Sequence, residues 1–466
     1  MTVGIGGQWA RFAVIGIGTL VGPLDSAVNI AFPDITRSFA IPIPSIQWVI
    51  ICYVLTYASL MLVFGRLGDQ FGHLRVFQAG LGVSAVAFLL CASARQFEWL
   101  LAFRVIQGVG AAMVISCGPA LVTGLFDEAK RPRVLGTYTM VFGIGSAVGP
   151  SLGGLMVDAW GWPTVFWFRL PLALVALGLA IGLRIERPAV ADKRFDFLGA
   201  LLLAGALSLL LLTVNQAQNT AIGPDLKLAL AAATVIAFAG FVLQERRAEA
   251  PIIDLGAFRH VDLALVNLTN VAVNLAGFSV MLLVPYFLVK ATDLPLAASG
   301  TILAAGPLGM IVAAQAGGQL AGRVGANRLG LCGAVLVGLG VLAVSGWAEG
   351  QAPALMVAVL VVHGAGLGLF QVASLDLVIA QLPRANRGVA GSLVMVTRTI
   401  GIVLAASLLM LLFVSFETAA AAAGAEAPFL AGFQATFRFT GLALLAFLGL
   451  TCLRPRLWFG RTGVRD

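Results

Sequence analysis

The sequence has little charge for its length. Asp, Glu, Lys and Arg together make up 11% of the 466 residues, whereas 60% are hydrophobic. In soluble domains about a quarter of the residues are charged, so this composition excludes an ordinary water-soluble protein. We therefore expect an integral membrane protein that is surrounded by lipid.

Residues on which many enzymes and pumps depend are scarce as well. The chain has three His and four Lys residues, and no Lys stands in the Gly-Lys-Ser or Gly-Lys-Thr context of a P-loop. It also lacks an HExxH motif. We expect no ATP, no cofactor, no metal and no enzymatic activity. The five Cys residues are spread one per predicted helix without metal-ligand spacing, and we interpret them as small packing residues.

Long apolar runs separated by short charged loops occupy the whole chain. Each run can cross about 30 Å of hydrocarbon as an α-helix. Near-continuous hydrophobicity with 55 Gly residues is typical of closely packed helices and not of the alternating strands of a barrel. The first run has no charged leader before it, so we expect it to be retained. We predict an all-α fold with fourteen transmembrane helices, over residues 10–32, 46–65, 76–94, 97–122, 134–157, 163–184, 197–214, 226–243, 262–288, 296–320, 329–347, 353–380, 388–415 and 430–453.

The formal net charge of +8 could indicate a nucleic-acid partner. Most of the 29 Lys and Arg residues, however, fall in the loops and tail on one side of the predicted topology. Because cytoplasmic loops of membrane proteins are enriched in Lys and Arg, the charge predicts orientation. We expect both termini to lie on the cytoplasmic side of a bacterial-type inner membrane, with no nucleic-acid partner, and we expect a monomer.

The chain repeats itself. GRLGDQFGHLR at 65–75 aligns with GQLAGRVGANR at 318–328, an offset of 253 residues, and VIQGVG at 105–110 aligns with VVHGAG at 361–366, an offset of 256. Transporters built from two repeated halves bind their cargo between the halves, which rock against each other. The repeat predicts a six-helix bundle at 1–187, two inserted helices with flanking loops at 188–260, and a second six-helix bundle at 261–466.

Four motifs follow one another along the chain: LDSAVNIAFPDI at 24–35, GRLGDQFGHLR at 65–75, LAFRVIQGVGAA at 101–112 and GIGSAVGPSLGG at 143–154. In this order they resemble the major facilitator superfamily, and within it the fourteen-helix drug:proton antiporter branch. The resemblance implies two pseudo-symmetric six-helix bundles plus two inserted helices, alternating access, and a proton as coupling ion. The chain departs from the family pattern at Arg169, where Asn is common, and it has no acid in helix ten, so transport of divalent cations is not expected.

Three charged residues lie at a similar depth inside predicted helices. Asp25, Arg104 and Arg169 are about six to eight residues from the outer helix ends, which is roughly 9 to 12 Å below the external surface. A charge inside the membrane costs several kcal/mol unless it is paired or hydrated, so these residues indicate a central polar cavity.

Asp25 is our candidate for the proton-coupling acid, and the resemblance implies a role in coupling for Arg104. Asn29 lies one helical turn beyond Asp25 and could bind substrate or Asp25 itself. The alternative is a fixed Asp25–Arg104 salt bridge that only holds helices together. Arg169 could attract an anionic substrate, pair with Asp158 or extend outward.

Polar residues in the second half are further candidates for substrate binding. Asn267, Asn270 and Asn274 share one helix face, which either lines the cavity or bonds a neighbouring helix. His363 takes the place of Gln107 in the repeat, where it could relay a proton or form a hydrogen bond within the bundle.

Two sets of charged residues are candidates for gating. The resemblance implies that the loop with Arg66, Asp69 and Arg75 latches the cytoplasmic side in one state and releases it in the other. Asp376 and Arg398 lie nearer the inner side of helices twelve and thirteen, and we expect a structural or gating pair there.

The motif GPSLGG in helix five is the third candidate for gating. Pro150 removes a backbone hydrogen bond, while Gly149, Gly153 and Gly154 allow another helix to approach closely. This combination predicts a bendable, tightly packed helix, and plain Gly-mediated packing is the alternative.

The function expected from these patterns is proton-coupled efflux of lipophilic drugs or metabolites, cationic or neutral, by alternating access. The alternative is an exporter or flippase of an anionic or zwitterionic amphiphile or lipid, which is suggested by Arg169 and by the shortage of acids in the second half.

Overall fold

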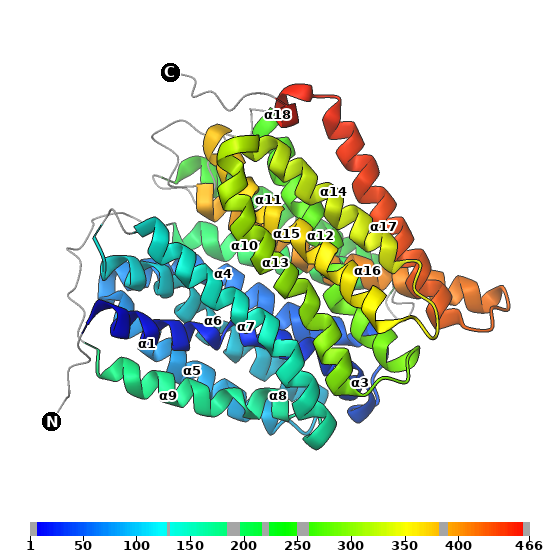
Figure 1. Cartoon of the computed structure of the whole chain (residues 1–466), viewed down its shortest axis with the longest axis horizontal. Helices are drawn as coiled ribbons and strands as arrows, with labels where there is room; N and C mark the ends of the chain where they lie inside the picture. Colours follow the sequence, from blue (N-terminus) through cyan, green and yellow to red (C-terminus); the bar gives the residue numbers. More distant parts are fainter. Residues whose placement is uncertain are drawn as a thin grey trace. The chain divides into compact units, whose positions relative to one another are not determined.

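The computed structural model describes residues 7–127, 131–183, 196–216, 223–248, 261–381 and 390–459, and every element in them is a helix (Figure 1). The all-α prediction is confirmed. The α-helices and the two 3₁₀-helices (η) are α1 Gln8–Leu20, η1 Pro23–Ser26, α2 Ala27–Ile30, α3 Phe32–Ser38, η2 Ile43–Ile46, α4 Gln47–Phe71, α5 His73–Ala92, α6 Phe97–Gly124, α7 Arg131–Trp160, α8 Thr164–Trp167, α9 Arg169–Ile181, α10 Phe197–Gln216, α11 Pro224–Arg247, α12 Val261–Lys290, α13 Leu296–Val324, α14 Ala326–Val344, α15 Pro353–Gln381, α16 Ala390–Ala422, α17 Pro428–Cys452 and α18 Pro455–Phe459.

Thirteen helical segments of the described residues are long and apolar enough to cross a membrane. They coincide with thirteen of the predicted spans. The remaining one, predicted at 197–214, corresponds to α10, whose described apolar stretch is the shorter segment Leu201–Leu210. The structure therefore contains a helix at each of the fourteen predicted positions.

The first span is interrupted where the sequence predicted one continuous helix. Its apolar segment Gln8–Ile30 consists of α1, the 3₁₀ turn η1 and α2. Pro23 stands at the start of η1, where its missing N–H removes a helical hydrogen bond. The amide of Asp25 then bonds the carbonyl of Gly22 at 3.0 Å, as a 3₁₀ turn requires.

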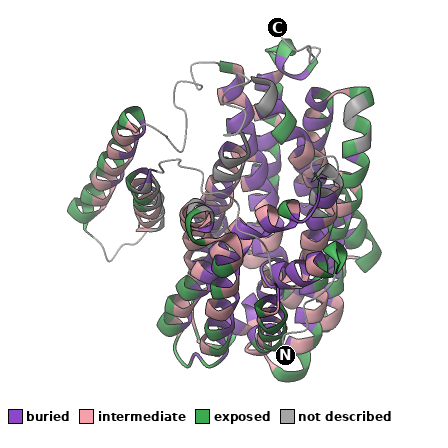
Figure 2. Cartoon of the chain, turned by 90° about the vertical axis from the view of Figure 1, so that its left-hand side faces the viewer, coloured by how far each residue is buried: buried purple, intermediate pink, exposed green. Residues whose placement is uncertain are grey.

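By their contacts, the residues divide into two compact units. Unit 1 comprises Met1–Ala204 and Pro295–Ala304, and unit 2 comprises Gly205–Leu294 and Ala305–Asp466. Within each unit the buried residues lie where helices meet, and exposed residues cover the outer helix faces (Figure 2). Many exposed residues are large and apolar, as lipid-facing helices require.

The predicted repeat has a counterpart in helix packing. In unit 1, α5 crosses α6 where Gly80 and Gly110 meet, and an added Cβ on either would lie 3.0 Å from the carbonyl oxygen of the other. In unit 2, α14 crosses α15 where Gly333 and Gly366 meet, with the corresponding distance 2.7 Å. The two pairs are related by the offsets of 253 (333 minus 80) and 256 (366 minus 110) that the motifs showed.

The matched turn of the two copies also has one backbone conformation. Gly72 separates α4 from α5 with φ of 98°, and Gly325 separates α13 from α14 with φ of 90°. Residues with a side chain rarely adopt this conformation, which explains why both copies have Gly there.

We expect Gly110→Ala to destabilise the protein by about 1–3 kcal/mol, because its methyl group would lie 2.5 Å from Ser84 Oγ and 2.8 Å from the Ser84 backbone nitrogen. Gly178→Ala in α9 is the matched control, since its methyl group would meet nothing within 4 Å. Thermal unfolding of the purified variants in detergent measures both effects. Equal melting temperatures for the two variants would show that the α5–α6 contact is looser than described.

Candidate functional site

Asp25 is held in place by the turn that carries it. The hydroxyl of Ser26 lies 3.0 Å from the carbonyl oxygens of both Pro23 and Ser146, and Ser146 belongs to α7. A side chain at Gly149 of α7 would collide with the Ser26 hydroxyl. The absence of that side chain thus lets α7 lie directly against the turn and fixes the position of Asp25.

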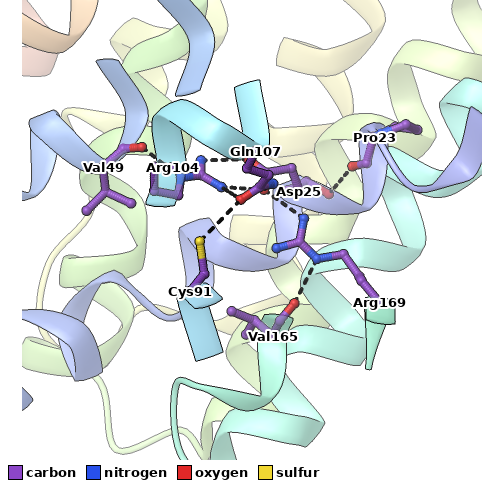
Figure 3. A network of polar contacts seen from close by, with 9 residues as sticks. Pro23, Asp25, Val49, Cys91, Arg104, Gln107, Val165 and Arg169 are labelled. Atoms are coloured by element: carbon purple, nitrogen blue, oxygen red, sulfur yellow. Dashed lines mark hydrogen bonds and ion pairs between the residues drawn. The ribbon is translucent and has the colours of Figure 1, made fainter. Parts of the chain in front are cut away.

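The carboxylate of Asp25 accepts hydrogen bonds from three side chains on two other helices (Figure 3). Arg104 in α6 binds both oxygens, with Nη1 to Oδ1 at 2.7 Å and Nη2 to Oδ2 at 2.8 Å. Gln107 Nε2 donates to Oδ1 at 2.8 Å, and Arg169 Nη1 in α9 donates to the same oxygen at 2.7 Å. Such charge-assisted, bidentate contacts are the strongest hydrogen bonds that proteins form.

Arg104 has partners of its own besides Asp25. Its Nε donates to the carbonyl of Val49 in α4 at 3.0 Å, and its Nη1 donates to Gln107 Oε1 at 2.7 Å. The guanidinium carbon lies 4.3 Å from the centre of the Tyr53 ring, within cation–π range. The residue therefore joins α4, α6 and the first span.

Arg169 is anchored in a similar way where α8 gives way to α9. Its Nε donates to the carbonyl of Val165 at 2.8 Å. The guanidinium carbon lies 4.6 Å from the ring centre of Phe88 and 5.1 Å from that of Phe166. Its Nη2 is buried and has no hydrogen-bond acceptor among the described residues.

The cluster combines two positive charges with one negative charge, and its members differ in exposure. The side chain of Asp25 is 14% exposed, whereas those of Arg104 and Arg169 are 2% and 0% exposed. Buried charges are stable only when close contacts replace the lost hydration. Each guanidinium has a carboxylate, a carbonyl and an aromatic ring as partners, and Asp25 is the least buried of the three charged side chains.

The structure thus brings together the three charged residues that the sequence placed at one depth. Arg169 binds Asp25 and neither pairs with Asp158 nor extends outward. Asn29 lies in α2, one turn after Asp25, and is half-buried. Sequence reasoning missed Gln107 as a ligand of Asp25, although its position three residues after Arg104 puts both side chains on one helix face.

The Asn stripe of α12 bonds a neighbouring helix. Asn270 Nδ2 donates to the Val394 carbonyl and to Thr397 Oγ1 in α16, both at 2.8 Å. Asn274 Nδ2 bonds Asn270 within α12. Thr397 Oγ1 also donates to Asn267 Oδ1, at 3.3 Å. The sequence left two roles open for this stripe, lining the cavity or bonding a neighbouring helix. These contacts match the second.

The remaining candidates of unit 2 lie on α15 and α16. His363 is buried next to Gly340, and its Nε2 has no partner among the residues that the structure describes. Asp376 is exposed on α15 and Arg398 is half-buried on α16. Within the described ranges these two side chains form no ion pair with each other. Their gating role therefore stays a prediction without a supporting contact.

The gating loop of unit 1 is described only in part. The side chains of Arg66 and Asp69 lie outside the described residues, and Arg75 is exposed in the first turn of α5. The backbone is helical as far as Phe71, so Arg66 and Asp69 belong to the end of α4. The latch stays a prediction.

The GPSLGG motif makes close backbone contacts within unit 1. An added Cβ at Gly153 would lie 2.9 Å from the Ala27 carbonyl oxygen, and Gly154 faces the backbone of Leu296 and Gly300. Helix α7 continues through Pro150. These contacts match the predicted tight packing, and bending of the helix stays a prediction.

The sequence matches known proteins along most of its length. The family model of the Major Facilitator Superfamily matches residues 14–406 and 266–459. The multidrug resistance protein Stp of Mycobacterium tuberculosis strain H37Rv is 30% identical over 396 residues, which cover 84% of this chain and 74% of Stp. The tetracenomycin C resistance and export protein of Streptomyces glaucescens is 31% identical over 396 residues, 83% of this chain and 72% of that protein.

Other relatives extend the comparison. The riboflavin transporter RibZ of Clostridioides difficile strain 630 is 29% identical over 406 residues, covering 85% of this chain and 86% of RibZ. Among solved structures, a peptide transporter POT in complex with sulfate has a TM-score of 0.74 at 15% identity, covering 99% of this chain and 98% of that one. At that identity the likeness concerns the fold alone.

The charge balance of the cluster predicts an order of stability. Asp25→Asn leaves two buried guanidiniums without a counter-ion, whereas Arg169→Gln leaves Asp25 paired with Arg104. Breaking a buried ion pair from one side costs about 3–5 kcal/mol, so we expect the larger loss for Asp25→Asn. The double variant should recover part of that loss, since one unpaired charge is removed.

Melting temperatures of the three variants, measured in one detergent and at one pH, test this order. A double variant that melts below Asp25→Asn would mean that Arg169 stabilises the protein independently of Asp25.

Proposed function

The chain belongs to the Major Facilitator Superfamily, and on that premise we propose that it exports lipophilic small molecules in exchange for protons, by alternating access. It is a transporter and not an enzyme. Relatives named for multidrug resistance and for tetracenomycin C export support drug efflux, whereas RibZ is named for riboflavin transport. The observation that carries the proposal is the Asp25 carboxylate, the partly exposed member of an otherwise buried charge cluster.

Proton binding at Asp25 would change the hydrogen bonds that join the first span to α6 and α9. Protonation of one oxygen removes the negative charge, so the contacts from Arg104 and Arg169 lose their ionic character. The guanidiniums keep their bonds to the Val49 and Val165 carbonyls and their contacts with aromatic rings. The bonds that weaken on protonation are thus those that join the two Arg residues to the first span.

This weakening is the step that we assign to coupling. Asp25 lies on the turn between α1 and α2, and α7 lies against that turn through Ser26 and Gly149. A change in the bonding of Asp25 would thus alter how the first span contacts α6, α7 and α9. Two arrangements with different proton affinity are what an antiporter needs. Arg104 and Gln107 position the carboxylate in this scheme.

Other predicted residues have roles within the same proposal. Asn29, Asn270, Asn274 and His363 remain candidates for contact with cargo, and the GPSLGG segment is a candidate for gating. Arg66, Asp69 and Arg75 are proposed as the cytoplasmic latch, and Asp376 and Arg398 as gating residues.

A second candidate function is export or flipping of an anionic or zwitterionic amphiphile or lipid. The excess of one positive charge in the buried cluster favours it. Reconstituted protein with labelled lipids separates it from drug export, since lipid movement between leaflets needs no drug.

Proton exchange is measurable in inside-out vesicles with an acidified interior. For the wild type, addition of an exported compound should move protons out of the vesicles and reduce the gradient reported by a pH-sensitive fluorophore. Tetracenomycin C, riboflavin and a lipophilic dye are suitable probes because the relatives are named for the first two. Asp25→Asn should abolish the signal, because the exchangeable proton has lost its site.

Glu98→Gln is the matched control. Glu98 is exposed in the first turn of α6, the helix that carries Arg104, and its variant should behave as the wild type. A full signal with Asp25→Asn would remove Asp25 from coupling, and transport by the wild type without proton movement would remove the proton from the mechanism.

A further inference from the structure

The charge count around Asp25 bears on which cargo the transporter accepts. Six helices contact either the turn that carries Asp25 or the two Arg residues bound to it, namely α4, α5, α6, α7, α8 and α9. The charged or titratable side chains that they present to the cluster are Cys52, Tyr53, Cys91, Arg104 and Arg169. Among the described contacts no second acid approaches either guanidinium. With Asp25 ionised, the cluster has a net charge of +1.

Arg169 supplies the surplus charge. Arg104 already binds both oxygens of Asp25, and Gln107 adds a further neutral donor. The positive charge of Arg104 thus already balances the negative charge of Asp25. Arg169 adds a second full positive charge to Oδ1 and is itself completely buried. The charge of Arg169 is therefore not needed to neutralise the Asp25 carboxylate. It can act instead on a transported molecule.

Arg169 also has one donor group without an acceptor among the described residues. Its Nε and Nη1 have acceptors, but its buried Nη2 has none in the part of the chain that the structure describes. A buried donor without an acceptor is costly. Because Arg169 is completely buried, its effect on cargo beside Asp25 is electrostatic, and a cationic group there would be repelled by a site that is already positive.

We propose that Arg169 selects the cargo by charge: the transporter accepts neutral or acidic lipophilic compounds and rejects compounds with a permanent positive charge. The inference rests on the proposed function, and it narrows the cationic or neutral cargo that the sequence predicted. Cargo beside Asp25 meets a carboxylate backed by two guanidiniums, and the sum of their charges repels a cation. Arg169 acts here as a specificity-determining residue.

Three forms of one fluorescent dye test this selection in inside-out vesicles: an uncharged form, a form with a carboxylate, and a form with a quaternary ammonium group. For the wild type we expect uptake of the first two and at least tenfold slower uptake of the quaternary form. Arg169→Asn should raise uptake of the quaternary form at least tenfold, because the site then carries no net charge. Arg169→Lys keeps the charge and should keep the wild-type selectivity.

Quaternary dye uptake by the wild type within twofold of the uncharged dye would overturn the proposal, and this comparison needs no variant to fold. Unchanged selectivity in a folded Arg169→Asn protein would overturn the role of Arg169. Failure of the proposed function has a different signature: with the uncharged dye, proton movement that survives Asp25→Asn would refute coupling at Asp25 whatever the charge preference.

Discussion

An ionised carboxylate in the interior of a membrane protein can persist only where several donors replace the water it has lost, and unit 1 is organised around meeting this requirement at Asp25. Arg104, Gln107 and Arg169 reach one carboxyl group from α6 and α9. Each guanidinium is in turn fixed by a backbone carbonyl and an aromatic ring. The same bonds that stabilise the charge of Asp25 also define how the first span contacts its neighbours. The charge state of Asp25 and the packing of the first span are therefore linked.

Local breaks in helices supply the positions that this cluster needs. Pro23 converts one turn of the first span into a 3₁₀ turn, which places Asp25 beside α6 and α9 and Ser26 beside α7. Arg169 opens α9 directly after the break at Phe168. Gly149 allows α7 to approach the turn closely. At the first of these points Pro23 and Leu24 are buried, so protein covers that part of the irregular backbone, as a membrane interior requires.

Most of the fold could be predicted from the sequence, because membrane spans depend on length and hydropathy, which are local properties. The repeat offsets of 253 and 256 also relate the contact of Gly80 with Gly110 to that of Gly333 with Gly366. The site could be predicted only in part. Counting residues gives the depth of Asp25, Arg104 and Arg169 but not the direction in which each side chain points. The ion pair of Arg169 with Asp25 depends on the turn at Pro23 and on the break before α9, which a continuous helix does not contain.

The long sequence separation within the charge cluster has a consequence for biosynthesis. Arg104 follows Asp25 by 79 residues and Arg169 follows it by 144. The ribosome therefore delivers the acid of the first span well before either counter-ion exists, and an uncompensated Asp at the centre of a span costs about 2.5–3.5 kcal/mol during insertion. The first span consequently relies on its apolar flanks, or on waiting beside the translocon until α6 emerges, to enter the bilayer.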